Sequence, residues 1–256
     1  MNLIMIIRTE LLKTKRTAVI WLIILGALFI PAIFFMMYFF KPEVFIPMLK
    51  PDPWLSHFIR GWQSLSAFLL PMFIILVCSL IPQIEYKNNT WKQVFASPQS
   101  YGNIFFSKLV TIHLMILLCF ILFTVFMVCS AVALNIANKS FPFFEHRLDI
   151  AYLGRMIFKT YISVLAIAAI QYWISLRFKN FITPIGIGLG FLITSLILMQ
   201  WEHIDKVPYA FPLLTLNSLV SGSAKWLENH EIYSLGYFIF FTVIAFIDLK
   251  YRKEKG

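Results

Sequence analysis

Residues 17–40, TAVIWLIILGALFIPAIFFMMYFF, contain no charged side chain. An α-helix rises about 1.5 Å per residue, so a run of this length crosses the roughly 30 Å hydrocarbon core of a bilayer. The run is too long for the apolar part of a signal peptide, and no small-residue cleavage site follows Phe40. It therefore predicts a transmembrane helix near the N-terminus.

Five more apolar runs follow along the chain. They are Trp62–Ile84, Val110–Leu134, Thr160–Leu176, Phe181–Gln200 and Ile232–Asp248. The run that starts at Thr160 is short, and it lengthens to Leu153 if Arg155 and Lys159 extend to the outer head groups. The sequence thus predicts an all-α integral membrane protein with six transmembrane helices, Thr17–Phe40 being the first.

The composition excludes the other broad classes of protein. Hydrophobic residues make up 60% of the 256 residues and charged residues 13%, which a soluble domain of this size could not bury. The net charge of +10 would suggest a nucleic-acid partner in a soluble protein, but in a membrane protein it indicates basic cytoplasmic loops, so we expect no nucleic acid. The three cysteines lie inside apolar runs and predict neither a disulfide framework nor a zinc site.

The distribution of charge predicts the orientation. Thirteen of the 22 basic residues and four of the 12 acids fall on one side of the six predicted spans. Basic residues collect on the cytoplasmic side, so both termini are predicted to be cytoplasmic. The basic residues on that side are Arg8, Lys13, Lys15, Arg16, Lys87, Lys92, Lys108, Arg177, Lys179, Lys250, Arg252, Lys253 and Lys255.

We expect one transmembrane domain, residues 1–256, with a helix ahead of the first span. Residues 1–16 carry apolar side chains on one helical face, which predicts an amphipathic helix along the inner leaflet, the alternative being a plain charged flank. A kink is expected at Pro71, near the middle of the second span. Gly186 and Gly190 have the small-xxx-small spacing that favours close helix packing.

Residues 85–108, EYKNNTWKQVFASPQSYGNIFFSK, separate the second and third spans on the cytoplasmic side. Asn and Thr at 88–90 are good helix caps and Ser97-Pro98 is a good stop, so a short helix is predicted between them. It places Trp91, Val94 and Phe95 on one face. A two-turn helix is not stable alone in water, so it must dock on a partner or on lipid. The alternative is that Trp91 alone anchors the segment at the interface.

Residues 201–231 lie on the outer side, between spans five and six. Their middle part, VPYAFPLLTLNSLVSG, is apolar but too short to cross a bilayer. This pattern predicts a re-entrant hairpin buried against protein. The alternative is an ordinary outer loop lying on the membrane.

Groups that could perform chemistry inside the membrane are sparse. No charged residue lies at the predicted centre of a span, and the candidates for a substrate path or for helix packing are Gln171, Thr194 and Ser195, with Gly186 and Gly190. For Gln171 we favour an interhelical hydrogen bond. No histidine pair or metal motif is present, so we expect no metal site and no catalytic residue. The chain has no Gly-Lys dipeptide and hence no P-loop, so any ATP must be bound by a separate subunit.

The sequence of the cytoplasmic segment resembles that of the same segment in type-2 ABC exporter permeases. That family has a Glu, a Thr and a Pro in this connection, and they match Glu85, Thr90 and Pro98. Two stretches resemble the lantibiotic-immunity (bacteriocin self-protection) branch in particular. They are the sequence Asn-Thr-Trp-Lys at 89–92 and residues 171–177, which precede Asn180-Phe181.

The resemblance implies the partners and the role of each residue. It implies a second permease copy or a related permease, two cytoplasmic ATPase subunits that bind ATP and Mg, no cofactor in this chain, and a multi-pass location in the bacterial cell membrane among its lipids. Residues 90–96 would be the coupling helix that docks on the ATPase. Trp91 and Phe95 would anchor it, with Val94 on the same face and with Glu85 and Lys92 as polar contacts.

The predicted function is therefore the permease half of an ATP-driven exporter that removes an amphipathic peptide antibiotic from the membrane for immunity or resistance. An alternative keeps the mechanism but exports a lipid, glycan, drug or ion. A second alternative is an unpowered channel or scaffold, which should show a polar stripe along one span. An intramembrane enzyme should show two reactive groups at matching depth, and the sequence shows neither feature.

Overall fold

The computed structural model describes residues 3–15, 17–87, 99–222 and 225–251. These residues form helices and no strand, which confirms the predicted all-α fold. The α-helices are α1 (Leu3–Thr14), α2 (Ala18–Phe40), α3 (Pro42–Leu49), α4 (Pro53–Ser64), α5 (Leu70–Lys87), α7 (Tyr101–Ala137), α8 (Ile150–Arg177), α9 (Ile182–Ile197), α10 (Phe211–Val220) and α11 (Asn229–Tyr251). The shorter elements are η1 (Leu65–Leu69), η2 (Phe143–Glu145), η3 (Leu198–Gln200), η4 (Ile204–Lys206) and η5 (Pro208–Ala210).

Six helical stretches of the described residues are long and apolar enough to cross a membrane, as predicted. They are α2, the continuous stretch Pro53–Lys87 formed by α4, η1 and α5, then α7, α8, the stretch Ile182–Gln200 formed by α9 and η3, and α11. α7 has 37 residues and is therefore about 55 Å long. It extends well beyond a 30 Å hydrocarbon layer, so part of it stands outside the membrane.

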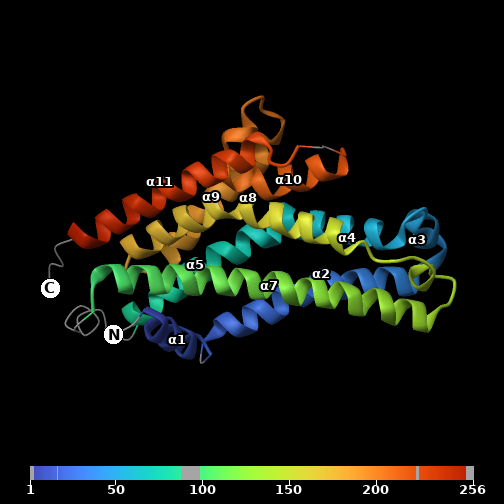
Figure 1. Cartoon of the computed structure of the whole chain (residues 1–256), viewed down its shortest axis with the longest axis horizontal. Coiled ribbons are helices and arrows are strands. Elements are labelled where there is room, and N and C mark those ends of the chain that lie inside the picture. Colours follow the sequence, from blue (N-terminus) through green and yellow to red (C-terminus); the bar gives the residue numbers. More distant parts are fainter. Residues whose placement is uncertain (1–2, 16, 88–98, 223–224, 252–256) are drawn as a thin grey trace.

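The long helices run side by side, and both ends of the chain lie at the same end of the molecule (Figure 1). We call this end the base. It contains α1, the beginning of α7 and the last turns of α5, α8 and α11 (Figure 1). The opposite, distal end contains α3 and the beginnings of α4 and α8 (Figure 1). An even number of crossings requires this arrangement of the two termini.

The helix α8 lies at the centre of the bundle. It packs against α5 on one side and α11 on the other, while α2 packs along α7. Small side chains, among them Ser163, Ala166 and Ala169, are buried along α8 and let its neighbours approach closely. By contrast, α9 and α11 expose long apolar faces that suit contact with lipid or with another membrane chain.

The fourth span differs from the prediction in where it begins and in the partner of Lys159. α8 begins at Ile150, ahead of the predicted start. Lys159 does not extend to the head groups, so that prediction is wrong: its side chain is buried and its Nζ lies 3.4 Å from Glu231 of α11. The counter-charge of Lys159 is thus the carboxylate of Glu231, and not a lipid head group. The Nη2 of Arg155 donates to the carbonyl of Lys225 at 2.9 Å.

The second span is irregular just before Pro71. Residues 65–69 form a π-helical turn, in which the N–H of Leu70 donates to the carbonyl of Leu65. Proline has no N–H and its ring crowds the carbonyl four residues earlier, so a widened turn at this place relieves the conflict. The kink expected at Pro71 stays a prediction; the structure shows a π-helical turn directly before it.

The segment after α9 folds into η4, η5 and α10. α10 packs against α8, α4 and α11, and the Thr215 hydroxyl lies 2.9 Å from the His230 ring. The apolar middle of residues 201–231 is therefore buried against protein on one side. Whether it dips into the membrane as a hairpin stays a prediction.

Candidate functional site

The predicted coupling segment joins the last turn of α5 to the first turn of α7, at the base. Residues 88–98 lie outside the described residues, and with them the predicted positions Thr90, Trp91, Lys92, Val94, Phe95 and Pro98. The two helices that carry this segment are described. The serine hydroxyl of Ser100 accepts from the N–H of Asn103 and caps the start of α7.

Four charged side chains form a closed ring between α1, α5 and α7. Nζ of Lys108 on α7 lies 2.8 Å from a carboxylate oxygen of Glu10 on α1 and 2.8 Å from one of Glu85 on α5. Nζ of Lys13 lies 2.8 Å from the other oxygen of Glu10 and 2.9 Å from the other oxygen of Glu85. Charges alternate around this charge ring, so it is neutral overall and ties three helices together.

Burial differs around the charge ring. The side chains of Lys108 and Glu85 are 1% exposed and that of Glu10 6%, while Lys13 is 35% exposed. That Glu85 is a polar contact for an ATPase stays a prediction; within this chain its carboxylate faces the interior, where it binds the two lysines. An isolated carboxylate there would be strongly destabilising, which is why both of its oxygens have a cationic partner.

The charge ring perturbs the titration of the two α1 residues. Burial alone would raise the pKa of Glu10, but the charge and hydrogen bonds of Lys108 and Lys13 outweigh it and hold the pKa below its usual value. Burial alone would lower the pKa of Lys13, but Glu10 and Glu85 outweigh it and raise the pKa. Both residues are therefore held in their charged forms at neutral pH.

The last turns of α5 are also fixed to α8. The Tyr86 hydroxyl donates to the carbonyl of Leu176 at 2.8 Å, and the amide of Gln83 donates to the carbonyl of Phe178 at 3.2 Å. With the charge ring on the other side, residues 83–87 at the end of α5, which we call the stem, are held by α1, α7 and α8 together.

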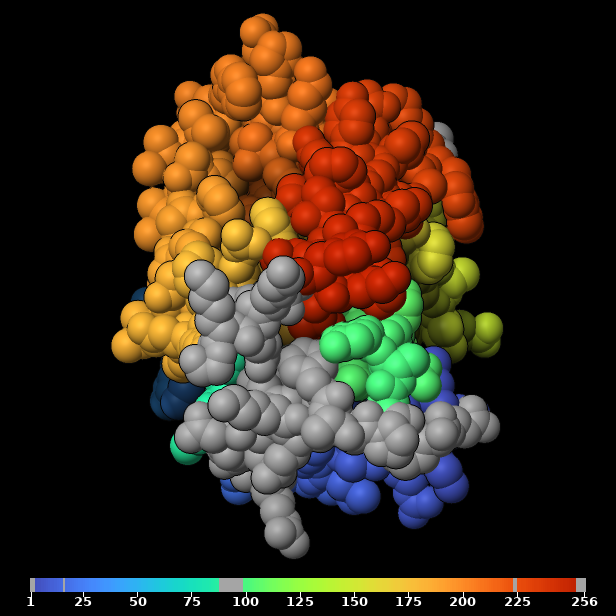
Figure 2. All heavy atoms as spheres, turned by 90° about the vertical axis from the view of Figure 1, so that its left-hand side faces the viewer, coloured from blue at the N-terminus to red at the C-terminus, as the bar shows by residue number. Residues whose placement is uncertain are grey.

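The beginning of α7 also contacts the end of α11. Figure 2, which looks onto the base, shows the two side by side, and the rings of Phe105 and Phe246 lie 5.5 Å apart. Nearby, Arg177 at the end of α8 binds Asp248 of α11 at 2.8 Å, and the indole N–H of Trp173 donates to the same carboxylate. At the base, α11 therefore contacts both the beginning of α7 and the end of α8.

Gln171 lies at a buried junction of α5, α8, α9 and η5. Its amide nitrogen donates to the carbonyl of Pro184 at 2.8 Å and to the hydroxyl of Ser79 at 3.3 Å. Its carbonyl accepts from the Tyr209 hydroxyl at 3.1 Å. A Cβ on Gly188 would lie 2.7 Å from this carbonyl oxygen, so α9 can approach here only because residue 188 is glycine.

The other predicted polar and glycine positions of α9 are spread over different faces. Ser195 is buried and donates to the carbonyl of Leu192, and Thr194 is exposed. A Cβ on Gly186 or Gly190 would meet no described atom within 4 Å. Among the residues that the structure describes, this pair thus makes no close helix contact. The close contact occurs at Gly188, because the face of α9 that carries Gly188 meets α5.

Sequence reasoning overlooked the partners of Glu85. From the sequence, Lys108 and Lys13 are ordinary cytoplasmic charges. One signal was available: Ile6, Glu10 and Thr14, the buried positions of α1, recur every four residues, so an acid stands in the middle of the buried face. Among the described residues, no group of three or more His, Cys, Asp or Glu side chains could hold a metal ion.

Comparisons with known proteins place the chain by its sequence. A family model described as ABC-2 family transporter protein matches residues 6–195 of the 256. The matched region runs from α1 to α9 and includes the charge ring and the segment between α5 and α7. Neither the curated proteins nor the solved structures gave a match.

Proposed function

Because the chain belongs to the ABC-2 family of transporter membrane proteins, we propose that it is the permease subunit of an ATP-driven exporter, with residues 88–98 as the part that a cytoplasmic ATPase holds. As a family member the chain is a multi-pass membrane transport component that works with ABC ATPase partners. The single observation that carries the proposal is the rigid stem of the segment, with Glu85 bound to two lysines at 2.8–2.9 Å.

A coupling segment must pass force to the spans rather than bend freely at its own root. Here α5 and α7 flank the segment, the charge ring joins both to α1, and Gln83 and Tyr86 join α5 to the central helix α8. Movement of the ATPase pair would therefore tilt α5, α7 and α8 as a group. Glu85 acts in this scheme as a positioning residue of the stem, while Trp91 and Phe95 make the contact.

The partners follow from the same scheme. We propose two ATPase subunits, which bind ATP and Mg, and a second copy of this permease or a related one beside it. The exposed apolar faces of α9 and α11 leave room for such a neighbour or for lipid. The base then faces the cytoplasm of a bacterial cell, in agreement with its excess of basic residues.

The proposed cargo is an amphipathic peptide antibiotic of the lantibiotic or bacteriocin type, exported for immunity. The support is the resemblance of residues 89–92 and 171–177 to permeases of that branch. Export of a lipid, glycan, drug or ion through the same mechanism is the alternative. An unpowered channel or scaffold is favoured by no contact among the described residues.

The proposal is tested by Trp91→Ala in the full chain, co-expressed with its ABC ATPase partner. An anchor of this kind contributes about 2 kcal/mol, so the affinity for the ATPase should fall about 30-fold and peptide resistance should be lost, with membrane expression unchanged. Trp226→Ala is the matched control, because Trp226 is an exposed tryptophan in the connection between α10 and α11. Equal ATPase binding and equal resistance in both variants would overturn the proposal.

A further inference from the structure

A serine of α11 is inserted into the backbone hydrogen bonding of the central helix α8. Ser234 is buried, and its hydroxyl donates to the carbonyl of Ile162 at 2.6 Å and accepts from the N–H of Ala166 at 3.1 Å. In a regular α-helix these two groups bond to each other, because each N–H donates to the carbonyl four residues earlier. One hydroxyl of a neighbouring helix thus offers a partner to both groups of a helical hydrogen bond.

This arrangement makes the turn 162–166 easier to open. A backbone N–H and a carbonyl that separate in an apolar interior lose their partners, which is strongly destabilising. A serine hydroxyl has one donor and two acceptor positions, so Ser234 can hold both groups while they move apart. Side chains inserted in this way are a known cause of kinks in helices. The turn can therefore open without leaving either group unsatisfied.

Two hydroxyls of α8 itself act on the adjoining turns. Thr160 donates to the carbonyl of Met156 at 2.8 Å, and Ser163 donates to the carbonyl of Thr160 at 2.7 Å. Hydroxyls that bond back to carbonyls of their own helix slightly destabilise it and often bend it. α8 contains no proline, so these hydroxyls and Ser234 are the features of this stretch that favour a bend.

The two parts of α8 on either side of the turn are attached to different elements. On the distal side, Arg155 and Lys159 donate to the carbonyl of Lys225 ahead of α11, and Lys159 also pairs with Glu231 in the first turn of α11. On the side of the base, α8 and the residue after it bind the stem and the end of α11. A bend at 162–166 would therefore move the distal part relative to the stem.

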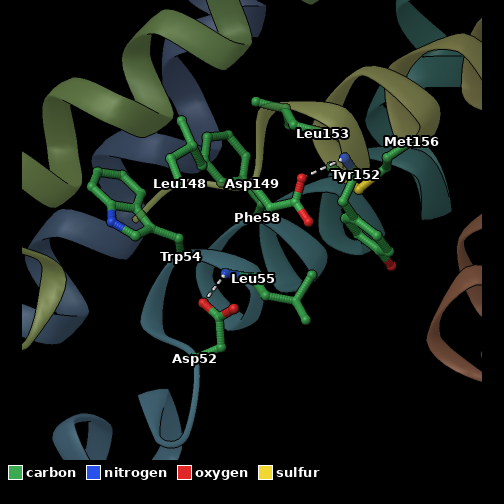
Figure 3. Close-up of a pocket in the computed structure, with 9 residues that line it drawn as sticks. All are labelled: Asp52, Trp54, Leu55, Phe58, Leu148, Asp149, Tyr152, Leu153 and Met156. Carbon is green, nitrogen blue, oxygen red and sulfur yellow. Dashed lines mark hydrogen bonds between the residues drawn. The ribbon is translucent and has the colours of Figure 1, made fainter. Parts of the chain in front are cut away.

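A cavity lies beside the distal part, between the beginnings of α4 and α8 (Figure 3). Tyr152 and Met156 of α8 line it together with Trp54 and Phe58 of α4. Its volume is about 70 Å³, which corresponds to a width of about 4 Å if its three dimensions are equal. The distal part of α8 is thus not closely packed on this side, and a small movement toward α4 meets space before it meets a side chain.

We propose that residues 162–166 of α8 form a hinge, in which Ser234 holds the opened turn, and that α8 bends there when the ATPase subunits displace the base. The hinge is a property of this chain, whereas the ATP-driven movement rests on the proposed function. Residue 150 lies about 21 Å along the helix from residue 164, so a tilt of about 10° would displace it by about 4 Å.

The hinge is tested by proline substitutions in the full chain, with thermal unfolding in maltoside detergent. Proline removes an N–H and crowds the carbonyl four residues earlier, so Ala169→Pro should lower the unfolding temperature by at least about 6 °C. Ala166→Pro should lower it by less than half as much, because the carbonyl of Ile162 has the Ser234 hydroxyl as a second donor. Both alanines are buried in α8, so the two variants are matched. Equal destabilisation by the two would overturn the hinge.

The role of the serine is tested in double variants. Ala166→Pro with Ser234→Ala should be destabilised as strongly as Ala169→Pro, because the carbonyl of Ile162 then has no second donor. Ala166→Pro with Ser218→Ala is the control, since the Ser218 hydroxyl donates to the carbonyl of Thr215 in its own helix. If Ser234→Ala has no larger effect than Ser218→Ala, the assignment of Ser234 is refuted.

The movement is measured by electron paramagnetic resonance in the complex with the ABC ATPase partner. Spin labels are placed at Phe40, at the end of α2, and at Ile150, at the beginning of α8, both of which are exposed. Cys129→Ala removes the exposed native thiol. Between the nucleotide-free and the ATP-and-vanadate states, the distance should change by about 4 Å in Ser218→Ala and by less than about 1 Å in Ser234→Ala.

The outcomes separate the hinge from the proposed function. Equal changes of distance in Ser218→Ala and Ser234→Ala would contradict the hinge as the point of movement. If the proline results are as expected but the natural chain shows no change of distance with ATP, the hinge stands, and the ATP-driven movement is contradicted together with the proposed function.

Discussion

Replacing Lys108 by methionine should detach the N-terminal helix from the bundle. Lys108 is 1% exposed and lies 2.8 Å from Glu10 and 2.8 Å from Glu85. Methionine has a similar volume but no charge, so the variant leaves two buried carboxylates to share Lys13. The perturbation therefore acts on the electrostatics of the charge ring and little on its packing.

The magnitude follows from the burial of the two lysines. Removing one partner of a buried ion pair typically costs about 3–5 kcal/mol, because the remaining charge stays buried without compensation. Lys13 is 35% exposed, so water already screens its pairs, and Lys13→Met should cost about 1 kcal/mol or less. The two variants make the same chemical change and differ in burial, so the ratio of their effects tests the geometry.

The assay combines thermal unfolding in detergent with hydrogen–deuterium exchange of residues 3–14. For Lys108→Met the unfolding temperature should fall by at least about 6 °C, at about 2–4 °C for each kcal/mol. Exchange of α1 should rise to that of an undocked helix. In the double variant with Glu85→Gln, one balanced pair of Glu10 and Lys13 remains, so part of the lost stability should return.

Two results would refute this reasoning. If Lys13→Met and Lys108→Met are equally destabilised, the difference in burial has no energetic consequence. If Lys108→Met leaves the exchange of α1 unchanged, the ring does not dock that helix, and apolar contacts of Ile6 with the bundle must suffice.

Three further outcomes are expected. Acid should loosen α1: the pKa of Glu10 is lowered in the folded chain, so its stabilising effect is complete above its unfolded pKa of 4.5 and is lost as the pH falls through the lower folded value. Glu10→Gln should therefore show a shallower fall of the unfolding temperature between pH 6 and pH 3. Gly188→Ala should cost about 1–3 kcal/mol by crowding the hydrogen-bonded amide of Gln171, whereas Gly186→Ala should leave the unfolding temperature within about 2 °C. Arg177→Gln should cost less than about 1 kcal/mol in the same assay, because its side chain is 56% exposed.

The six spans could be predicted from the sequence because the requirement for crossing a bilayer depends only on consecutive residues. A helix that crosses it needs about 20 apolar residues in a row, and the run 17–40 meets that demand without reference to any other part of the chain. The same holds for the return of both ends to one side.

The partners of charged residues could not be read in this way. Lys159 was expected to extend to the head groups, and it instead faces Glu231, a residue 72 positions later. Glu85 is predicted as a polar contact for an ATPase, and the sequence does not show that Lys13 and Lys108 bind it within the chain. A charge near the end of an apolar helix can satisfy itself with solvent or with a distant counter-charge, and spacing along one helix does not distinguish the two.

Sequence alone determined that this chain crosses a membrane six times and which loops carry its positive charge, since both depend on runs of residue type along a single line. Only the tertiary structure decided that α8 is the central helix, that Gly188 and not Gly186 permits a close approach, and that the end of α5 is tied to α1. These features depend on which face of each helix meets a neighbour, and that choice is made by the packing of all the helices together.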